Sequence, residues 1–562
     1  MNNRTTELPN YRTLVDPVTV EVIGNALLAV ADEMGASLIR SAYSTNIKER
    51  RDCSTALFDA AGEVVAQAEH MPMHLGALLG IVAETERRFG PTLKPGDVIV
   101  SNDPYTGGST HLPDITLCQP VFVDGALAGY VTNTAHHADV YRTAPRTIYE
   151  EGPRIPPIRL YDGGQLREDV LELILLNYQI PEQRLGDLRA QLAANATGER
   201  RFQDLFERYG RATLEAAMIE LLAYGERKIR AAIRAIPDGT YTFLDYLDDD
   251  AVGDTPVPIR VAITVAGDRM RLDFTGTGPQ SRGDINVVYL ALLATVYYSI
   301  KALLDPSVPP NGGFFRSLEV VAPEGCLLNA RPPGACDWRT QPCQRVADAI
   351  FGALAPVIPE RVIAATNGAN TAIFFSGPNP ATNRPFAYLE TLAGGSGARA
   401  TKDGLDAIQV HITNSSNLPV EALEMEYPLL VETYALVPDS GGAGRWRGGL
   451  GLRRDIRALG EGVIFHGHLE RSRLAPWGLF GGGEGGRARL AVNPGSTQER
   501  PLPPKVYGVS LAPGDIVSII TPGSGGYGPP AERDRQLLQE DLLEGKVTPA
   551  GARAYGYVDL GG

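Results

Sequence analysis

The sequence predicts a mixed α and β fold of the α+β class: a large multi-unit chain with antiparallel sheets, packing helices and a glycine-rich β part toward its C-terminal end. Three observations support this prediction. The chain has 562 residues, more than one ordinary domain holds, so two to four packed units are expected. Apolar runs of strand length flank turn dipeptides, which indicates antiparallel hairpins. Helical segments occur in blocks, without the strict strand-helix alternation of a doubly wound parallel sheet.

Caps, periodicity and turn residues predict the N-terminal elements. Residues 16–42 place apolar side chains at helical spacing behind an Asp-Pro start, which predicts a long amphipathic helix. Residues 53–67 form two short apolar runs across an Ala-Gly turn, which is typical of a β-hairpin. A second helix is expected over residues 75–89. Two extended runs around Asp124-Gly125 then predict another hairpin, because this dipeptide suits a two-residue turn.

The later elements follow from a change in composition. Beyond Leu166, charged residues flank an apolar stripe, which predicts packing helices. Strands are expected over residues 239–275, a buried helix over 288–304 and a surface helix over 532–544. Glycine is frequent from about Tyr427 onward, where it permits tight turns and close backbone approach. We predict three regions: an N-terminal metal-site region with a helical segment (1–240), a central α/β region (241–426), and a Gly-rich β region with a C-terminal helix (427–562).

Composition excludes several classes of partner. The 52 Lys and Arg against 66 Asp and Glu give a net charge of −14, which disfavours nucleic acid, because phosphate binding needs a clustered basic field. The N-terminus lacks a signal-peptide pattern, and no uninterrupted apolar window is long enough to span a membrane. The cysteines are odd in number and lack C-x-x-C spacing, so a reducing, cytoplasmic location is expected. They are Cys53, Cys118, Cys326, Cys336 and Cys343.

Histidine clustering points to a metal site. Five of the eight histidines lie between positions 70 and 137. In the loop "SNDPYTGGSTHLPDI", His111 and Asp114 stand three apart around Pro113, so an extended loop end is expected rather than a helix. A two-residue turn in the following hairpin would place His136 opposite Pro113, flanked by His111 and Asp114. Two imidazoles and a carboxylate meeting at one hairpin end suit Zn²⁺, Mn²⁺ or Fe²⁺ with an open position for water.

The hairpin leaves the choice between two neighbouring histidines open. Strict alternation puts His136 on the face of His111 and His137 on the face of Asp114. Because Pro113 should disturb the ladder, we expect His136 to be the ligand, with His137 as the alternative or as a substrate contact.

Other side chains near this cluster carry weaker signals. Asp52, in "KERRDCS", could be a fourth ligand, since its carboxylate would be poorly placed in a core strand without a partner. His70 and His74 could be packing groups, groups that orient a ligand, or ligands. An isolated H-x-x-D pair is often only part of a loop held by hydrogen bonds. Metal binding is favoured here because the second strand of the hairpin brings the histidines of "AHHAD" back to this loop.

Signals for other chemistries are weak. "LDFTGTGPQ" is rather like the phosphate loop of actin-type ATPases, but a second loop and an adenosine motif are not found, so a structural turn at Asp273 is expected. No G-x-x-x-x-G-K-[ST] or G-x-S-x-G motif occurs. Cys53 is expected to be a small buried hydrophobe rather than a nucleophile. We expect that this chain itself does not bind ATP.

Taken in order, several motifs resemble one known family. They include "NIKERRDCSTALFDAAGEVVAQAEHMPMHLGAL", "NDPYTGGSTHLPDITL", "AHHADV", "VPPNGGFFR", "HITNSSNLPVEALEMEYP", "GRWRGGLG" and "TPGSGGYGPPAERD". They are similar to the hydantoinase B family, which includes the acetone carboxylase alpha subunit and the C-terminal half of 5-oxoprolinase. The resemblance runs from about Asp16 to the C-terminus. In length the chain is most like the beta subunit of an ATP-dependent (N-methyl)hydantoinase.

The resemblance implies a division of labour between two subunits. A hydantoinase A partner with an actin-like ATPase fold binds ATP and phosphorylates a carbonyl oxygen of the substrate. The hydantoinase B subunit then completes the reaction at a divalent metal, by opening a cyclic amide such as hydantoin, N-methylhydantoin, 5-oxoproline or another lactam. The family's metal ligands carry over to Asp52, His111, Asp114 and His136, of which the last three are the expected catalytic residues. Glu49 or Asp139 is expected to orient an imidazole.

Two alternatives accompany this hypothesis. In the ketone branch of the family the same arrangement carries out biotin-independent, ATP-dependent carboxylation of acetone or acetophenone. A non-catalytic scaffold with a structural metal is the other alternative. The leading expectation is a hydrolase acting on cyclic amides, in a cytoplasmic hetero-oligomer.

Overall fold

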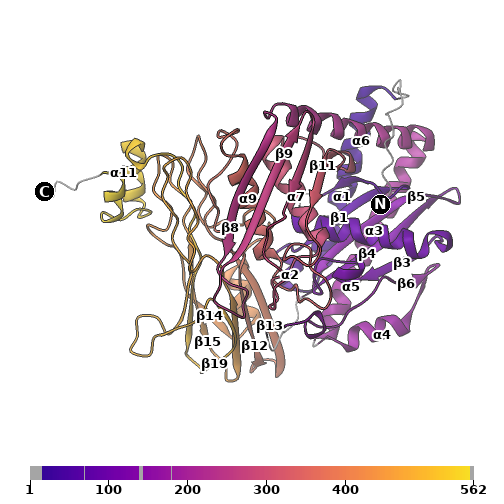
Figure 1. The fold of residues 1–562 in the computed structure, drawn as a ribbon. Helices are drawn as coiled ribbons and strands as arrows, with labels where there is room; N and C mark the ends of the chain where they lie inside the picture. Colours follow the sequence, from indigo (N-terminus) through magenta and orange to yellow (C-terminus); the bar gives the residue numbers. More distant parts are fainter. Residues whose placement is uncertain (1–14, 69, 138–143, 179, 557–562) are drawn as a thin grey trace.

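The computed structural model describes residues 15–68, 70–137, 144–178 and 180–556, and its mixture of helices and sheets confirms the predicted fold class (Figure 1). The N-terminal elements lie at one end of the molecule and the glycine-rich β region at the other, with the central strands and helices between them.

A seven-stranded sheet organises the N-terminal region. The elements are α1 (Pro17–Ser41), α2 (Thr45–Lys48), β1 (Cys53–Asp59), β2 (Val64–Gln67), α3 (Leu75–Phe89), β3 (Val98–Ser101), β4 (Asp114–Val123), β5 (Ala126–His136), β6 (Ile158–Asp162), β7 (Gln165–Leu166), α4 (Glu168–Leu176), α5 (Pro181–Tyr209) and α6 (Arg211–Arg234). The strands run in the order β2-β1-β5-β4-β3-β6-β7 with antiparallel neighbours. Leu57 packs with α1, α5 and α6, whereas Phe58 packs with α3 on the opposite face. Helices therefore cover both faces of this sheet.

The central region pairs a second sheet with two buried helices. Its elements are β8 (Gly239–Leu247), β9 (Val257–Ala266), β10 (Arg269–Asp273), α7 (Tyr289–Leu304), α8 (Gly312–Phe315), β11 (Leu318–Val321) and α9 (Thr340–Leu354). The strand order is β11-β10-β9-β8, with β10 and β11 parallel. The inward residues of β9, including Val261 and Ile263, share one apolar core with α7 and α9. Nearly every residue of α9 is buried, which makes it the central helix of the molecule.

Two further sheets form the C-terminal region. The elements are β12 (Thr371–Asn379), β13 (Arg384–Leu392), α10 (Val420–Glu426), β14 (Leu429–Leu436), β15 (Leu452–Ala458), β16 (Val463–His468), β17 (Arg489–Val492), β18 (Arg500–Pro501), β19 (Lys505–Leu511), β20 (Ile516–Ile520) and α11 (Arg535–Leu543). The orders are β13-β12-β16-β19 and β14-β15-β20-β17-β18. Phe375 and Phe465 of the first sheet share a core with Ile456 and Ile519 of the second. The first sheet contains β12 and β13, which precede the predicted boundary at residue 426, and β16 and β19, which follow it. The boundaries of the three predicted regions stay a prediction.

Close backbone approach explains part of the glycine content of this region. A Cβ added at Gly523 would lie 1.8 Å from the carbonyl oxygen of Ser440. Any larger residue there would force the two segments apart.

Helix α1 has the length and hydropathy of a membrane span, with a mean hydropathy of 1.4 over an 18-residue window. It nevertheless packs into the protein along one face, where Ile23, Leu27, Met34 and Leu38 are fully buried. Its Asp16 side chain caps the first turn by accepting from the backbone N–H groups of Val18 and Thr19. These contacts are those of a core helix.

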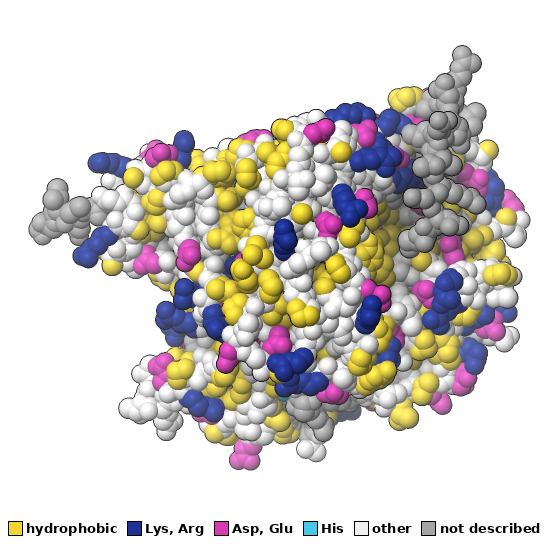
Figure 2. All heavy atoms as spheres, in the orientation of Figure 1, with side chains coloured by type: hydrophobic (Ala, Val, Ile, Leu, Met, Phe, Trp, Pro, Cys, Tyr) yellow, Lys and Arg dark blue, Asp and Glu magenta, His cyan; other side chains and the backbone are white. Residues whose placement is uncertain are grey.

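Charged side chains are interspersed on the face shown in Figure 2, where basic and acidic groups lie among apolar and uncharged ones.

Candidate metal centre

Two imidazoles and a carboxylate meet at the end of the β4-β5 hairpin. His111 lies in the turn before β4, Asp114 begins β4, and His136 ends β5. One ligand atom from each of the three residues lies within 4.8 Å of the other two. His111 Nε2 is 3.1 Å from Asp114 Oδ1, and the centroids of the two imidazole rings are 5.0 Å apart. The structure therefore brings together three of the four residues that the sequence singles out.

The hairpin register differs from the expected one by a single residue. The turn at Asp124-Gly125 is as predicted, with φ positive at both residues. A β-bulge between Val121 and Phe122 then adds one residue to β5, so that His136 pairs with Asp114 and not with Pro113. The expectation that His136 lies opposite Pro113 was wrong, because a bulge leaves no clear mark in the sequence.

This register also separates the two neighbouring histidines. Directly paired residues point to the same face of a sheet, so His136 shares a face with Asp114. His137 is fully buried elsewhere, with Nε2 2.9 Å from Gln191 Oε1 on helix α5. The structure thus places His136 in the cluster and His137 against a packing helix.

Asp52 and His74 flank the cluster. The backbone N–H of His136 donates to the carbonyl of Asp52 at 3.0 Å, which holds the start of β1 beside the end of β5. His74 Nε2 lies 3.5 Å from Asp52 Oδ1 and 3.7 Å from Asp114 Oδ1, between the two carboxylates. Its Nδ1 is 3.1 Å from Ser54 Oγ. Asp52 is therefore next to the three-residue group, and its carboxylate faces His74.

Sequence reasoning missed two residues that contact the cluster. The Arg339 guanidinium donates to Asp114 Oδ2 at 2.9 Å and to Thr110 Oγ1 at 2.8 Å. Asp337 Oδ1 is 3.4 Å from His111 Nδ1. Both residues come from the segment before α9, more than 200 positions along the chain, and no local spacing links them to the hairpin.

In the part of the chain that the structure describes, the carboxylate beside His111 Nδ1 is that of Asp337, and the expectation for Asp139 stays a prediction. Asp337 contacts His111, whereas Glu49 is half-buried and its carboxylate acts on that of Glu426, whose pKa it helps to raise. Asp139 lies outside the described residues.

Several polar atoms of the cluster are buried without a hydrogen-bond partner. They are Asp52 Oδ1, both ring nitrogens of His111, Asp114 Oδ1 and His136 Nδ1. Such atoms are unfavourable in a folded protein, because each has left water without gaining an equivalent partner. A divalent cation bound by imidazole nitrogens and carboxylate oxygens would satisfy them together, so these residues fit a metal of the zinc, manganese or iron class.

The electrostatics of the cluster favour ligands in their metal-binding forms. Burial lowers the pKa of His136 to about 3, so its imidazole is neutral at neutral pH. Burial alone would raise the pKa of Asp114, but His111, His74 and Arg339 hold the pKa of this carboxyl well below its usual range. A neutral imidazole and an ionised carboxylate are the forms that bind a divalent cation.

A small cavity of about 60 Å³ adjoins the cluster. Asp52, His74, His111 and His136 line it. This volume exceeds what one water molecule requires, but it is far below the 300 Å³ or more of typical ligand pockets.

The remaining motifs have structural explanations. Asp273 Oδ1 accepts from the backbone N–H of Thr275 at 2.9 Å, which confirms the expected turn at the end of β10. Cys53 is fully buried, and burial raises the pKa of its thiol, so it is not a thiolate nucleophile.

Comparison with known proteins gives the family. The model of the family described as Hydantoinase B/oxoprolinase matches residues 16–530. The chain belongs to this family. The beta subunit of the caprolactamase of Pseudomonas jessenii is 32% identical over 563 residues, which cover 97% of this chain and 96% of that one. The 5-oxoprolinase 1 of Arabidopsis thaliana is 32% identical over 551 residues, which cover 92% of this chain and 42% of that one.

Two solved structures share the fold of this chain. The crystal structure of the ATP-dependent caprolactamase from Pseudomonas jessenii superimposes with a TM-score of 0.90 at 31% identity, covering 97% of both chains. A nucleotide-free acetone carboxylase structure gives a TM-score of 0.88 at 19% identity, covering 97% of this chain and 80% of that one, which is a likeness of fold alone.

Proposed function

We propose that this chain is the metal-bearing subunit of an ATP-dependent cyclic-amide hydrolase that opens a hydantoin, N-methylhydantoin, 5-oxoproline or other lactam ring. The observation that carries the proposal is the buried cluster of His111, Asp114 and His136, with unpartnered ligand atoms beside a cavity. Several buried ligand-type atoms without partners, gathered at one point of the chain, are what an empty metal site presents.

The proposed ligands of a zinc, manganese or iron ion are Asp52, His111, Asp114 and His136. Bound there, a divalent cation supplies Lewis acidity, and it lowers the pKa of water to near neutrality. Two carboxylates supply the negative charge that retains the cation, and Arg339 fixes the orientation of Asp114 through its second oxygen. Of the four, His111, Asp114 and His136 are the proposed catalytic residues.

His74 is placed to handle a proton near the reacting atoms. Its Nε2 faces the carboxylates of Asp52 and Asp114, and its Nδ1 faces the Ser54 hydroxyl. Burial lowers the pKa of His74, although both carboxylates oppose this shift. A neutral imidazole held between a hydroxyl and two carboxylates can accept a proton and return it to the leaving nitrogen.

We propose that a hydantoinase A-type partner with an actin-like fold binds ATP and phosphorylates the substrate's carbonyl oxygen. An amide carbonyl is a poor electrophile, and a phosphate on its oxygen makes the carbonyl carbon more electrophilic. Water adds to that carbon, the C–N bond breaks to open the ring as an acyl phosphate, and a second water releases the phosphate. Support comes from the lack of a Walker A motif in this sequence and from the printed name of its relative, a caprolactamase beta subunit. A hetero-oligomer of the two subunits follows.

Ring opening is favoured over ketone carboxylation. Support comes from the solved structure named an ATP-dependent caprolactamase, which is 31% identical in sequence to this chain, whereas the acetone carboxylase structure is 19% identical and shares the fold alone. We also propose a cytoplasmic location, supported by five buried cysteines that are all free thiols.

Purification with a hydantoinase A-type partner subunit, followed by a screen of ATP-dependent turnover, tests the proposal. We expect ring opening of at least one hydantoin or lactam without bicarbonate, and loss of at least 100-fold in kcat/KM for His111→Ala. Bicarbonate-dependent ATP consumption with acetone or acetophenone would instead assign a carboxylase. Retention of turnover in His111→Ala, with its metal lost, would leave this chain as a scaffold.

A further inference from the structure

Two side chains reach the metal centre from residues 333–339, the segment that precedes α9. Asp337 Oδ1 lies 3.4 Å from His111 Nδ1, and Arg339 donates to Asp114 Oδ2 at 2.9 Å. The segment belongs to no helix and to none of the named strands. Its position, and with it that of both side chains, therefore depends on the contacts that other parts of the chain make with it.

Glu151 fixes the backbone of this segment. It directly follows the short helix Ile148–Glu150 and is 1% exposed. Its Oε1 accepts from the backbone N–H of Cys336 at 2.5 Å and from that of Asp337 at 2.8 Å. Two successive N–H groups thus converge on one oxygen atom, which sets the position of the residue whose side chain contacts His111.

Further contacts hold the same two segments together. The backbone N–H of Ile148 donates to the carbonyl of Pro333 at 2.8 Å. Leu112, Ile148 and Cys336 form one buried apolar cluster. Because Leu112 directly follows His111 in the chain, this cluster joins the loop of a proposed metal ligand to the segment that Glu151 holds.

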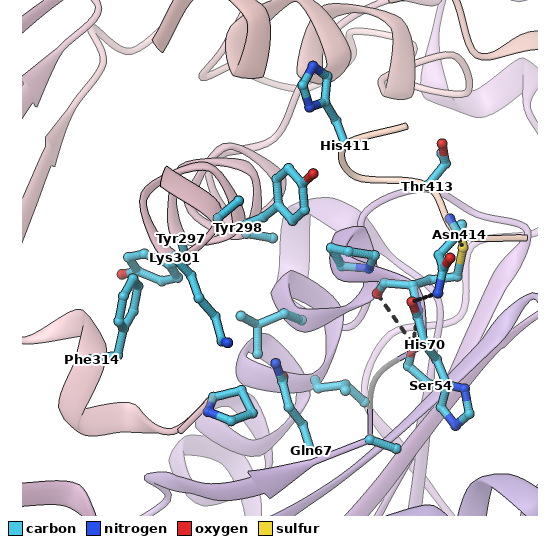
Figure 3. A pocket seen from close by; sticks show the side chains of 18 of the residues that line it. Ser54, Gln67, His70, Tyr297, Tyr298, Lys301, Phe314, His411, Thr413 and Asn414 are labelled. Carbon is cyan, nitrogen blue, oxygen red and sulfur yellow. Dashed lines mark hydrogen bonds between the residues drawn. The ribbon is translucent and has the colours of Figure 1, made fainter. Parts of the chain in front are cut away.

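Glu151 acts from outside the cavities at the metal centre. A second cavity of about 440 Å³ adjoins the small one, and Met71 and Thr413 line both (Figure 3). Asp337 lines the small cavity, whereas Glu151 is among the described lining residues of neither. Glu151 therefore influences the metal centre through the segment that it holds, and not by contact with a bound molecule.

The two hydrogen bonds to Glu151 require an acceptor oxygen and not a negative charge. Burial raises the pKa of Glu151 well above its ordinary value, and the nearby carboxylate of Asp337 raises it further. A protonated carboxyl group still accepts both N–H groups through its carbonyl oxygen. The position of this oxygen is therefore what Glu151 contributes.

Asp337 in turn determines how His111 faces the cluster. An ionised carboxylate beside Nδ1 accepts the proton of that nitrogen, and the imidazole then keeps a lone pair on Nε2. His111 Nε2 is the atom that lies 3.1 Å from Asp114 Oδ1, on the side of the cluster. The hydrogen bonds of Glu151 thus bear on the imidazole nitrogen that faces the proposed metal.

We infer that Glu151 is a positioning residue of the metal centre, whose carboxyl group holds Asp337 where its carboxylate orients His111. The inference rests on the proposed function, in which His111 is a metal ligand. It assigns a role in metal affinity to a residue that is 186 positions from Asp337 in the chain and lines neither cavity.

The Zn²⁺ affinity of the full-length protein, measured by competition with a chelator of known affinity, tests the inference with two matched variants. Glu151→Gln keeps the side-chain length and an acceptor oxygen without the charge, so it should bind Zn²⁺ as the wild type does. Glu151→Asp keeps the carboxyl group but withdraws its oxygen by one methylene group, so it should bind Zn²⁺ about tenfold more weakly. Wild-type affinity in Glu151→Asp, or equal weakening in both variants, would overturn the inference.

A double variant tests whether Glu151 acts through Asp337. Asp337→Ala removes the carboxylate that Glu151 positions, so adding Glu151→Asp to it should cause no further loss of Zn²⁺ affinity. Residues that act separately would instead show losses that multiply, because their free-energy effects add. Multiplied losses in the double variant would contradict a role through Asp337.

Asp97 is the matched control for a buried carboxylate that holds backbone. It is fully buried, and it accepts from the backbone N–H groups of Lys94 and Gly163. Both partners lie outside residues 333–339 and outside the metal cluster, so Asp97→Ala should keep the Zn²⁺ affinity of the wild type even though its thermal unfolding midpoint falls. If Asp97→Ala weakens Zn²⁺ binding as much as Glu151→Asp does, general loosening of the fold explains the effect and the inference is wrong.

The inference and the proposed function fail in different ways. If the wild type binds no Zn²⁺ that is lost in His111→Ala, the proposed metal centre falls and the role of Glu151 falls with it. If the wild type binds Zn²⁺ at His111 and Glu151→Asp binds it equally well, the metal centre stands and only the role of Glu151 falls.

Discussion

Two buried aspartates of this protein have similar neighbours but different surroundings. Asp348 and Asp114 are both almost inaccessible. Asp348 faces one imidazole and one guanidinium, and Asp114 faces two imidazoles and one guanidinium. Asp348 Oδ1 accepts from the Thr366 N–H and hydroxyl and lies 2.9 Å from His411 Nε2, while its Oδ2 accepts from Arg471.

Asp114 lacks this full set of partners. Its Oδ2 accepts from Arg339, but its Oδ1 has no hydrogen-bond partner and faces His111 and His74. The comparison teaches that burial of charge is not by itself a sign of function. Both oxygens of Asp348 have partners within the chain, whereas Asp114 Oδ1 has no hydrogen-bond partner, and we propose that a bound cation supplies one.

The largest expected effect is on folding at the complete set. Asp348→Ala leaves Arg471 buried without its carboxylate, so we expect the free energy of unfolding to fall by about 3–5 kcal/mol. Asp114→Ala should lower it by less, because Asp114 Oδ1 has no hydrogen bond to lose whereas Asp348 Oδ1 has two from Thr366. Denaturant unfolding of both variants after treatment with a chelator measures the difference. Equal decreases in the free energy of unfolding would contradict the difference drawn between Asp348 and Asp114.

The neighbouring histidines offer a matched pair for metal retention. His136→Ala should lose the bound metal and at least 100-fold in ATP-dependent ring opening, since His136 faces Asp114. His137→Ala should keep the metal and lower the free energy of unfolding by about 1–3 kcal/mol, because Gln191 loses its buried partner. Elemental analysis measures the metal content of both variants. Metal loss in His137→Ala and not in His136→Ala would show that His137 is the ligand.

The contact between Asp337 and His111 should tune metal affinity. Because Asp337 Oδ1 lies 3.4 Å from His111 Nδ1, its carboxylate orients the imidazole. Asp337→Asn should weaken metal binding about 10- to 100-fold with the fold retained. Competition with a chelator of known affinity measures this change, and an unchanged affinity would show that Asp337 is a bystander.

The smallest effect is a pH dependence outside the metal centre. Burial lowers the pKa of His466 from 6.5 to about 4. Between these values the unfolded chain binds a proton that the folded chain does not, so stability falls as pH drops from 6.5 to 4 and the loss levels off below that. His466→Gln should reduce the slope of the free energy of unfolding against pH in this range. The reduction corresponds to at most one bound proton. Identical slopes for both proteins would show that His466 titrates normally when folded.

Local patterns made much of the fold predictable. The helix behind Asp16 and the turn at Asp124-Gly125 depend on near neighbours in the sequence, and both occur as expected. The same turn and the histidine spacing predicted that His136 joins His111 in one cluster, although the pairing partner of His136 differs from the expected one.

The remaining features depend on long-range packing. The bulge that pairs His136 with Asp114 arises where β5 passes against β1, since a Cβ at Gly129 would lie 2.2 Å from the carbonyl of Phe58. Asp337 reaches His111 because α9 packs through the centre of the molecule. No short-range pattern encodes such contacts, so the second cavity and the partners of the metal centre required the structure.

An anomalous difference map from crystals of the full-length protein, recorded at the absorption edge of the metal found by elemental analysis, tests the central claim most directly. We predict one peak among His111, Asp114 and His136, and none at Asp348 and His411. A metal-replete crystal with no peak among those three residues, or with its peak at Asp348, would contradict the account.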